Sequence, residues 1–429
     1  MSEYKEIKAA LLGAGTVGGG VYKLLQRRKA EMPSKIQADL SITKVLVRNA
    51  SKKREGIPDE VLTDDWSSIV HDPDISIVIE LMGGIEPART YILEALEAGK
   101  HVVTANKDLM AEHGKELMDA AERNHCDLQF EAAVAGGIPI IRPLKECLAG
   151  NEITEVMGIV NGTTNYILTK MTKDGMDFSE ALKKAQELGF AEADPTADIE
   201  GLDAGRKMAI LASIAFHSRV TFGDVDIKGI TNITARDIQY AKELGCTLKL
   251  LGVARNLDGE IEVGVFPMLL PSGHPLANVN DSFNAVFVHG DAVDDAMFQG
   301  RGAGEFPTAS AVVGDVIAVA RNMQYGCCGR IGCSCYKNLP LKASGDAEHK
   351  FFLRLLVEDR PGILAGVAGV LGNNSVSINQ VIQKPAVDGV AELVVITDKV
   401  VSRHLHDALV IFGEMSMIRK VASVIRVYA

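Results

Sequence analysis

Hydrophobic and polar positions follow two patterns along the first third of the chain. Short apolar runs alternate with longer stretches in which apolar residues recur at helical spacing. The runs predict buried strands and the longer stretches predict helices that cover them, so the sequence indicates an α/β fold with a parallel sheet. The expected strands are Ile7–Leu12, Ile42–Val47, Ile75–Glu80, His101–Thr104 and Asp127–Glu131, and two of the expected helices are Pro87–Ala98 and Asp108–Arg123.

Beyond Ala132 the pattern changes to glycine-rich turns, longer helices and a second set of strands. Two of these expected strands are Ile153–Val160 and Ile261–Leu270. We interpret this region as a second, α+β domain that faces the substrate. The apolar helical segment Ala309–Arg321 is expected to return and pack on the first domain.

A third pattern begins near Lys350, after a turn-rich and cysteine-rich linker. The order strand, helix, strand, strand, helix, strand predicts a βαββαβ unit of ferredoxin-like topology. Its expected elements are Phe351–Val357, Ile363–Gly372, Val376–Gln383, Val390–Thr397, Ser402–Gly413 and Ile418–Tyr428. The expected division is a nucleotide-binding domain at 1–135 with about 305–323, a substrate-binding and dimerisation domain at 136–304, a linker at 324–349, and a C-terminal domain at 350–429.

Composition narrows the class of protein. A chain of 429 residues is too long for one ordinary core, which agrees with two or three domains. Its formal net charge of −11 repels nucleic acid. The sequence shows neither an export signal nor an uninterrupted apolar run of about 18 residues, which a membrane span needs. Seven cysteines, an odd number, suggest free thiols in a reducing compartment. We therefore expect a cytoplasmic protein with no nucleic-acid or membrane partner.

A glycine-rich turn lies between the first expected strand and the following helix. Residues 13–18, Gly-Ala-Gly-Thr-Val-Gly, fit the dinucleotide-binding pattern G-x-G-x-x-G. The first glycine would allow the tight turn, the second the approach of a pyrophosphate, and the third the packing of helix against strand. The helix N-terminus would face negative charge. The expected dinucleotide-binding residues are Gly13, Gly15, Thr16, Val17 and Gly18.

The second expected strand ends in basic residues. It closes with Val47-Arg48-Asn49, and Lys52, Lys53 and Arg54 follow. An acid at this place binds the ribose hydroxyls of NAD, whereas a guanidinium can hold the 2′-phosphate of NADP. Arg48 therefore favours NADP, with NAD still possible. The alternative is a solvated basic loop.

Two lysines occupy positions that suit catalysis. Lys107 ends the segment Thr-Ala-Asn-Lys after an expected parallel strand, at the edge where open α/β sheets bind ligands. Lys207 comes four residues after Asp203, so these two side chains share one helix face. An exposed lysine and a surface ion pair are the ordinary alternatives. The helix continues with the apolar segment Met208–Leu211, which favours a functional pair.

Taken together, these motifs resemble those of homoserine dehydrogenases. The resemblance covers about residues 5–322, with all segments in the family's order. It implies a Rossmann domain, a catalytic and dimerisation domain, and NAD(P)-dependent interconversion of L-aspartate 4-semialdehyde and L-homoserine, in the pathway to threonine, methionine and isoleucine. The further segments that carry it are 131–139 (EAAVAGGIP), 161–165 (NGTTN), 192–195 (EADP), 201–203 (GLD) and 302–304 (GAG).

The resemblance also implies catalytic roles. Lys207 would donate a proton to the aldehyde oxygen, and Lys107 would lie beside nicotinamide and substrate. Glu192 and Asp203 would hold polar groups of the substrate, and Asp198 would support the same pocket. This agrees with the chemistry, because hydride transfer to an aldehyde places negative charge on its oxygen. Two neighbouring lysines would also lower each other's pKa and ease proton delivery.

Further contacts are implied for the cofactor and for a cation. Members of the family bind a sodium ion through the segment at Glu131, and backbone carbonyls of a glycine-rich turn suit a hard monovalent cation. The sequence alone does not reveal this site. The implied sodium ligands are Glu131, Val134, Gly136 and Ile138, and the implied additional cofactor contacts are Thr104, Gly189 and Gly304.

The C-terminal unit resembles an ACT domain. The resemblance rests on residues 359–364 (DRPGIL) and 377–380 (SINQ). It implies that an amino-acid effector binds between paired units, using Gly362 and Asn379. Threonine is the leading ligand because it is a product of the pathway, and a homodimer or homotetramer is expected. The alternative is a passive dimerisation module.

A cysteine cluster before this unit departs from the family pattern. Cys327, Cys328, Cys333 and Cys335 have the spacing C-C-x4-C-x-C, which is not a standard zinc pattern. Thiols without a role, or a redox-sensitive loop, are favoured over a metal site.

Two other functions compete with this assignment. One is a different semialdehyde or amino-acid dehydrogenase on the same scaffold. The other is a non-catalytic amino-acid sensor, against which the intact set of Lys107, Lys207, Glu192 and Asp203 argues.

Overall fold

The computed structural model describes residues 4–387 and 389–428 and divides into two compact units. The first contains the described residues up to Val156, Arg206–Asp224 and Asn284–Asn338. The second contains Met157–Gly205, Val225–Phe283 and the described residues from Leu339 onward. Within the described residues, no helix is long and apolar enough to cross a membrane.

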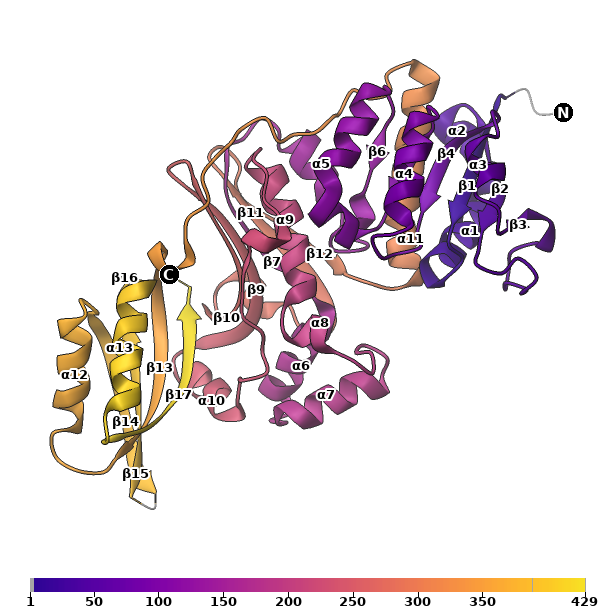
Figure 1. Ribbon diagram of the computed structural model, residues 1–429. Helices are drawn as coiled ribbons and strands as arrows, with labels where there is room; N and C mark the ends of the chain where they lie inside the picture. Colours follow the sequence, from indigo (N-terminus) through magenta and orange to yellow (C-terminus); the bar gives the residue numbers. More distant parts are fainter. Residues whose placement is uncertain (1–3, 388, 429) are drawn as a thin grey trace. The chain divides into compact units, whose positions relative to one another are not determined.

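A parallel six-stranded sheet forms the centre of the N-terminal part (Figure 1). Its strand order is β3-β2-β1-β4-β5-β6, so the connection after β3 crosses to the far side of β1. Such a switch point opens a crevice at the carboxyl ends of the strands, where ligands bind. The strands are β1 (Glu6–Leu12), β2 (Asp39–Leu46), β3 (Leu62–Thr63), β4 (Ile75–Glu80), β5 (His101–Thr104) and β6 (Leu128–Gln129).

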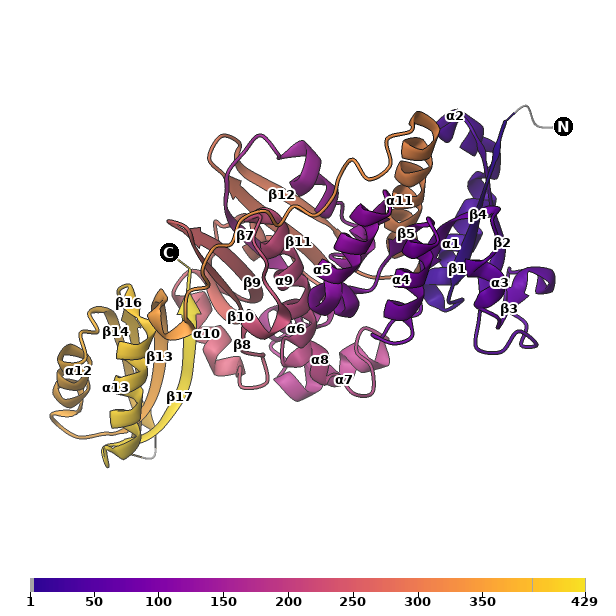
Figure 2. The ribbon, with the colours of Figure 1, turned by 45° about the horizontal axis from the view of Figure 1, so that its top comes forward.

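Helices cover both faces of this sheet, as the sequence predicts for an α/β domain (Figures 1 and 2). On one face α1 and α11 pack on each other, and their apolar residues share one core with Leu11, Ile79 and Val103. On the other face α4 packs on α5. Helix α11 therefore returns to this sheet as expected. The helices are α1 (Thr16–Arg28), α2 (Met32–Ile36), α3 (Ser67–Val70), α4 (Ala88–Glu97), α5 (Lys107–Arg123) and α11 (Glu305–Tyr325).

The first unit also contains strands β11 (Phe283–Gly290, from Asn284 onward) and β12 (Asp294–Arg301) and the start of β7 (Ile153–Ile159), in the order β12-β11-β7. A short η3 turn (Glu131–Ala133) and one turn of π-helix at Pro143–Cys147 lead from the parallel sheet to β7.

The second unit is built on a long, mainly antiparallel sheet with the order β9-β10-β17-β13-β15-β14. The hairpin of β9 (Cys246–Leu257) and β10 (Glu260–Pro271) pairs along its whole length. Short β8 (Asp226–Ile227) pairs with β10. The helices of this unit are α6 (Gly162–Lys173), α7 (Phe178–Glu187), α8 (Thr196–Ile199) and α10 (Ala235–Glu243), and α9 (Leu202–Ala215) begins here and continues into the first unit.

The C-terminal part has the expected βαββαβ order. Its two helices pack on one face of the sheet, around a core that includes Phe351 and Leu353. Strand β17 also pairs in parallel with β10, Leu269 opposite Val427. The elements are β13 (Glu348–Glu358), α12 (Ile363–Asn373), β14 (Ile378–Val387), β15 (Val390–Thr397), β16 (Val400–Val401), α13 (Ser402–Glu414) and β17 (Ile418–Val427).

The segment expected to be a linker, 324–349, is mostly irregular, with three differences. Residues Gln324 and Tyr325 belong to the end of α11, Ser344–Asp346 form a single 3-10 turn, and Glu348 and His349 begin β13. Helix α11 extends to Tyr325 because the residue that ends it is Gly326. This glycine takes the left-handed conformation, at φ 62°, that commonly terminates helices.

Candidate functional site

The turn between β1 and α1 accepts only glycine at two of its three glycine positions. Gly13 has φ +98°, and a Cβ there would lie 2.8 Å from the carbonyl oxygen of Leu81. A Cβ on Gly18 would lie 2.1 Å from the carbonyl oxygen of Gly13. Gly15, by contrast, faces open space and caps the exposed start of α1 at Thr16. The turn is therefore packed against protein on two sides and open toward a ligand at the helix N-terminus.

This turn borders a cavity of about 450 Å³ at the carboxyl ends of β1, β2 and β4. Its volume lies in the range of small-molecule sites. Arg48 and Arg54 line the cavity together with Gly13 and Gly15, and Asp64 is also part of its wall. The structure thus places two guanidinium groups beside the glycine turn, where the sequence singled out one.

A buried carboxylate cross-links the loops after β4 and β5. Glu80 accepts hydrogen bonds from the backbone N–H of Met82 (2.7 Å) and Gly83 (3.2 Å), and from the hydroxyl of Thr104 (2.6 Å). Thr104 also accepts from the N–H of Asn106 at 3.0 Å. The hydroxyl of Thr104, an expected cofactor contact, is thus engaged within the protein. Glu80 was not among the predicted site residues, although an acid that ends an apolar strand was the available signal.

The two candidate catalytic lysines lie on adjacent helices. Lys107 is the first residue of α5, and Lys207 lies in α9 with 9% of its surface exposed. Asp108 and Arg206, the residues next to these lysines, form an ion pair with Oδ1 and Nε 2.8 Å apart. This contact holds the first turn of α5 beside α9. Both lysines are therefore held near the carboxyl end of β5.

Two of the three expected substrate-binding acids share one partner. The side-chain amide of Asn161 donates to Asp198 (2.6 Å) and to Asp203 (2.9 Å). The same asparagine caps α6 by accepting from the N–H of Thr164 at 2.9 Å. Asn161 is a site residue that sequence analysis quoted only as part of a motif. Its signal was an asparagine in the N-cap position at the end of a strand.

The third acid, Glu192, lies on the exposed loop after α7. Its backbone carbonyl accepts a hydrogen bond from the side chain of Gln186 at 3.1 Å. The two expected glycine contacts both have left-handed backbones, with φ +74° at Gly189 and +126° at Gly304. Gly304 caps α11. Because both residues are glycines, no side chain covers the backbone at these two positions, and a ligand can approach it.

The expected cation-binding turn is buried and follows the η3 turn. The Glu131 carboxylate accepts three backbone hydrogen bonds, from residues 140, 141 and 142 at 2.6–2.8 Å. Ala135 and Gly136 have φ of 55° and 52°, and a Cβ on Gly136 would lie 2.3 Å from the Gly302 carbonyl oxygen. Two consecutive left-handed residues turn successive carbonyls in new directions. The turn can therefore offer carbonyl oxygens to a hard cation, while Glu131 shapes it.

One buried acid near this turn has an unusual pKa. Asp315 accepts from the N–H of Glu131 (2.8 Å) and from Arg142 (2.5 Å). Burial, followed by the negative charge of Glu131, raises the pKa of Asp315 to about 7, although Arg142 opposes this. Asp315 belongs to α11, so the contact joins that helix to the turn.

The two expected effector residues lie at the start of α12 and of β14. Gly362 has φ +90° and caps α12. The amide of Asn379 donates to Asp398 at 2.9 Å, and Ser377 donates to the same carboxylate at 3.1 Å. Asn379 is exposed, so its remaining hydrogen-bonding capacity faces solvent.

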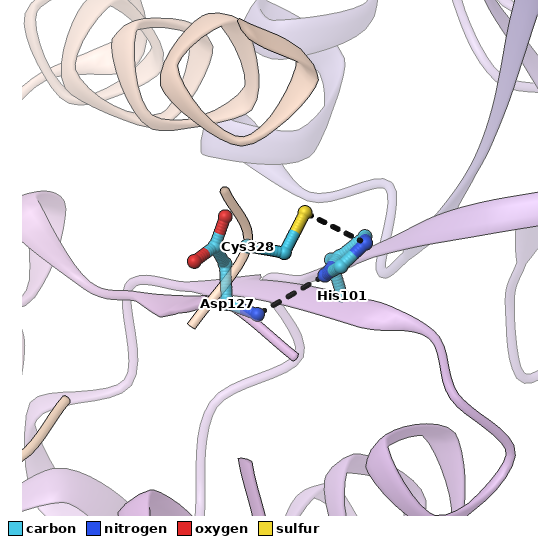
Figure 3. Close-up of side chains that lie close together, drawn as sticks. All are labelled: His101, Asp127 and Cys328. Carbon is cyan, nitrogen blue, oxygen red and sulfur yellow. Dashed lines mark hydrogen bonds between the residues drawn. The ribbon is translucent and has the colours of Figure 1, made fainter. Parts of the chain in front are cut away.

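The four clustered cysteines separate into two places. Within residues 4–387 and 389–428, one group of three potential metal ligands lies within 4.8 Å, and it consists of His101, Asp127 and Cys328 (Figure 3). His101 Nδ1 accepts the backbone N–H of Asp127 at 3.0 Å, so a neutral ring carries its proton on Nε2, toward Cys328. That proton occupies the position a metal would need. The Asp127 carboxylate already accepts from Asn322 (2.9 Å) and Gly329 (2.8 Å).

The comparisons with known proteins agree with this geometry. Three family models match: the NAD-binding domain of homoserine dehydrogenase at residues 13–131, homoserine dehydrogenase at 139–317, and the ACT domain at 351–409. Homoserine dehydrogenase of Bacillus subtilis (strain 168) is 47% identical and covers 99% of this chain and 98% of its own. That of Corynebacterium glutamicum is 47% identical, with 97% and 94% covered.

Solved structures agree as well. A homoserine dehydrogenase from Thiobacillus denitrificans has a TM-score of 0.93 and 39% identity, with 99% of this chain and 98% of its own covered. The S. aureus homoserine dehydrogenase at pH 7.5 has a TM-score of 0.80 and 36% identity over 100% of both chains. The chain therefore belongs to the homoserine dehydrogenases, a family of oxidoreductases with an NAD-binding domain, and it carries a C-terminal ACT domain.

Proposed function

We propose that this chain interconverts L-aspartate 4-semialdehyde and L-homoserine with NADPH as the electron donor, in the biosynthesis of threonine, methionine and isoleucine. One observation supports the assignment most strongly. The ion pair between Asp108 and Arg206 holds the helices of Lys107 and Lys207 together at the carboxyl edge of the sheet. Among the alternatives, a pure amino-acid sensor has no use for this arrangement.

Proton transfer is the step that the chain's own residues perform. NADPH supplies a hydride to the aldehyde carbon when it is bound. Lys207 donates a proton to the aldehyde oxygen, and Lys107 stabilises the developing negative charge. Asp203 and Asp198, held by the amide of Asn161, accept hydrogen bonds from the polar groups of the substrate, including its ammonium. Glu192, on the exposed loop after α7, would hold a further polar group of the substrate.

Two arginines support NADP over NAD. A 2′-phosphate at the end of β2 would be within reach of Arg48 and Arg54, both of which line the cavity beside Gly13 and Gly15. A hyperthermophilic archaeal homoserine dehydrogenase, 27% identical with a TM-score of 0.62, was solved in complex with NADPH. Thr16 and Val17 would present the helix N-terminus to the pyrophosphate, and Gly189 and Gly304 would approach the nicotinamide half.

We also propose a structural sodium ion on the turn after Glu131. The carbonyl oxygens of Val134, Gly136 and Ile138 would coordinate it, and Glu131 would act by fixing the turn through its three backbone hydrogen bonds. A hard monovalent cation suits neutral carbonyl ligands. The proposed role is to rigidify the connection between the sheet and α11.

Feedback by threonine is the proposed role of the ACT domain. Threonine would bind at Gly362 and Asn379, between paired C-terminal domains of a homodimer or homotetramer. We keep the domain bounds expected from the sequence, in which this domain covers residues 350–429. Removal of residues beyond Leu339 is a poor test, because β17 pairs with β10 and truncation would expose that strand. A point variant, Asn379→Ala, leaves the sheet intact. It should abolish threonine inhibition while preserving the uninhibited rate.

The test of the activity uses the full-length chain, aspartate semialdehyde and NADPH, with NADPH consumption as the readout. Lys207→Ala should reduce turnover about a hundredfold or more, the scale of general acid catalysis, and leave NADPH affinity nearly unchanged. Lys183→Ala, at an exposed position on α7, is the matched control and should retain full turnover. Near-normal turnover of Lys207→Ala would remove this lysine from the mechanism. No activity of the wild-type chain would refute the proposed substrate.

A further inference from the structure

A narrow cavity in the first unit is lined by two cysteines that the proposed reaction does not use. Cys333 and Cys335 lie in the irregular segment after α11 and border the cavity together with residues of α5 and α9. The volume is about 40 Å³. A water molecule requires about 10–15 Å³, so the cavity has room for a small molecule of two or three heavy atoms.

The two thiols are arranged as a pair. The Cys335 sulfur lies 3.6 Å from the Ser213 carbonyl oxygen on α9. Cys333 lies two residues before Cys335 in the chain and lines the same cavity. Both thiols therefore border one small space, where a disulfide between them would form.

Two cationic side chains face the pair. Lys145 and Arg219 line the same cavity, and Lys145 also donates to the Gly332 carbonyl at 3.4 Å. The hydrogen bonds from Cys335, together with these two charges, hold the pKa of Cys333 below its ordinary value. The pKa of Cys335 is raised, first by its hydrogen bond to Cys333 and then by burial. Of the two thiols, Cys333 therefore has the greater thiolate character, which is what controls the reactivity of cysteine.

The remaining cysteines for which a shift is resolved differ in this respect. Burial raises the pKa of Cys328 and of Cys126 to about 11, with the charge of Asp127 acting in the same direction. Burial also raises the pKa of Cys246. Thiolate character controls the reactivity of cysteine, so these three thiols are inert at neutral pH.

We propose that Cys333 and Cys335 form a peroxide-oxidisable dithiol, in which Cys333 is the reacting residue and Cys335 the resolving one. Hydrogen peroxide is small enough for a cavity of about 40 Å³. The charges of Lys145 and Arg219 would stabilise the leaving hydroxide. The oxidation itself does not require the proposed dehydrogenase reaction.

The reaction balances in two steps. The Cys333 thiolate attacks one peroxide oxygen, an S–O bond forms, the O–O bond breaks, and the departing hydroxide takes a proton from solvent to become water. The Cys335 sulfur then attacks the sulfenic sulfur, an S–S bond forms, the S–O bond breaks, and the hydroxide leaves as water with the Cys335 proton. Two thiols and one hydrogen peroxide give one disulfide and two waters, so sulfur is oxidised and oxygen is reduced.

The position of the cavity connects this chemistry to the two candidate catalytic lysines. Lys107 begins α5, and Lys207 lies in α9 two turns before Ser213. A disulfide would draw Cys335 toward Cys333 and away from the Ser213 carbonyl on α9. We expect turnover to fall on oxidation, an expectation that rests on the proposed roles of the lysines.

The modification itself is tested by peroxide titration of the reduced full-length chain, followed by alkylation and trypsin digestion. Cleavage after Arg330 and Lys337 gives a peptide, residues 331–337, that contains Cys333 and Cys335 and no other cysteine. It should lose two hydrogen atoms and resist alkylation at peroxide concentrations that leave the exposed Cys147 alkylated. Oxidation of this peptide only together with Cys147 would overturn the proposal.

Variants assign the two roles. Cys335→Ser should accumulate a sulfenic acid on Cys333 that a dimedone probe traps, whereas Cys333→Ser should leave Cys335 unmodified. Arg219→Gln should slow oxidation about tenfold by removing one charge. Equal trapping in both serine variants would refute the assignment of Cys333 as nucleophile. Unchanged turnover of the fully oxidised wild-type chain would refute the connection to catalysis, while the peptide data decide the site itself.

Discussion

The glycine turn after β1 and the face of the C-terminal sheet that packs on α10 each require particular residues. The physical reasons for the two requirements are opposite. At the turn the backbone comes so close to itself that a Cβ on Gly18 would lie 2.1 Å from a carbonyl oxygen. At the sheet face, the guanidinium of Arg354 donates to the buried carboxylate of Asp237 on α10 at 2.8 Å. One region excludes side chains, and the other needs a particular charged one.

The buried charge is fully surrounded by partners. Arg354 also donates to Glu392 (3.2 Å), Thr234 (3.1 Å) and Ser423 (3.3 Å), and Ser423 donates to Asp237 at 2.6 Å. This network fastens α10 to the face of the sheet opposite α12 and α13. The two regions therefore differ in how they fail. Loss of a glycine adds atoms where none fit, whereas loss of the arginine leaves a buried charge without compensation.

Replacement of Arg354 by methionine should have the largest effect on stability. The side chain keeps its apolar volume, but Asp237, which is fully buried, loses its cation. We expect the free energy of unfolding to fall by about 3–5 kcal/mol, measured by urea denaturation. The double variant Arg354→Met with Asp237→Asn removes the orphaned charge and should recover much of the loss. A double variant as unstable as the single one would show that packing, and not charge, holds this face.

Gly18→Ala should have the next largest effect, and it sharpens the comparison because its neighbour provides a control. The added methyl group meets the Gly13 carbonyl, so α1 must shift at the cofactor turn. We expect a loss of about 1–3 kcal/mol in unfolding free energy, the usual range for overpacking, together with weaker NADPH binding. Gly19→Ala, where the new methyl group meets open space, should be neutral in both measurements. Equal effects of the two changes would mean that close packing at Gly18 is unimportant.

The same contrast explains which features the sequence could predict. The glycine turn is built from residues within one short segment, and its pattern appears directly in the sequence. Strands β4, β5 and β15 have the predicted bounds, because their apolar runs end sharply at turn residues. Strand β6 is shorter than predicted, since after Gln129 the chain turns into η3, where Glu131 binds the backbone of residues 140–142.

Contacts between residues far apart in the chain could not be predicted. Arg354 and Asp237 are separated by 117 positions, and Asn161 and Asp203 by 42. Nothing near Arg354 in the sequence distinguishes it from an exposed strand arginine. Likewise, the separation of Cys328 from Cys333 and Cys335 depends on the path of the irregular segment after α11. The cysteine spacing alone suggested one cluster where the structure has two.

A smaller effect is expected for Arg48→Ala, at the edge of the cavity beside the glycine turn. Only NADPH carries the 2′-phosphate, so NADPH affinity should fall about tenfold, or 1.4 kcal/mol, while NADH affinity stays the same. Fluorescence titration with both nucleotides measures the two affinities. Arg54→Ala tests whether the second guanidinium of the cavity shares this role. Parallel losses for both cofactors would place Arg48 outside the phosphate site.

The smallest expected effect is a dependence of stability on pH that only the sheet face should show. This face contains a titrating group, whereas the close contact at Gly18 does not. Burial by itself would raise the pKa of Glu392, but hydrogen bonds from Arg236 and Tyr240 and the charge of Arg354 hold it below its ordinary value of 4.5. A carboxylate with a depressed pKa in the folded state stabilises the protein fully above pH 4.5, and this contribution is lost as pH falls through the folded pKa. Glu392→Gln lacks this contribution. The difference in unfolding free energy between wild type and Glu392→Gln should therefore be about 1 kcal/mol at pH 7 and should shrink below pH 4.5.

Gly18→Ala is the matched control, because its loss of unfolding free energy should not change with pH in this way. A Glu392→Gln deficit that stays constant from pH 7 to pH 4 would show that the ionised carboxylate contributes nothing to this contact.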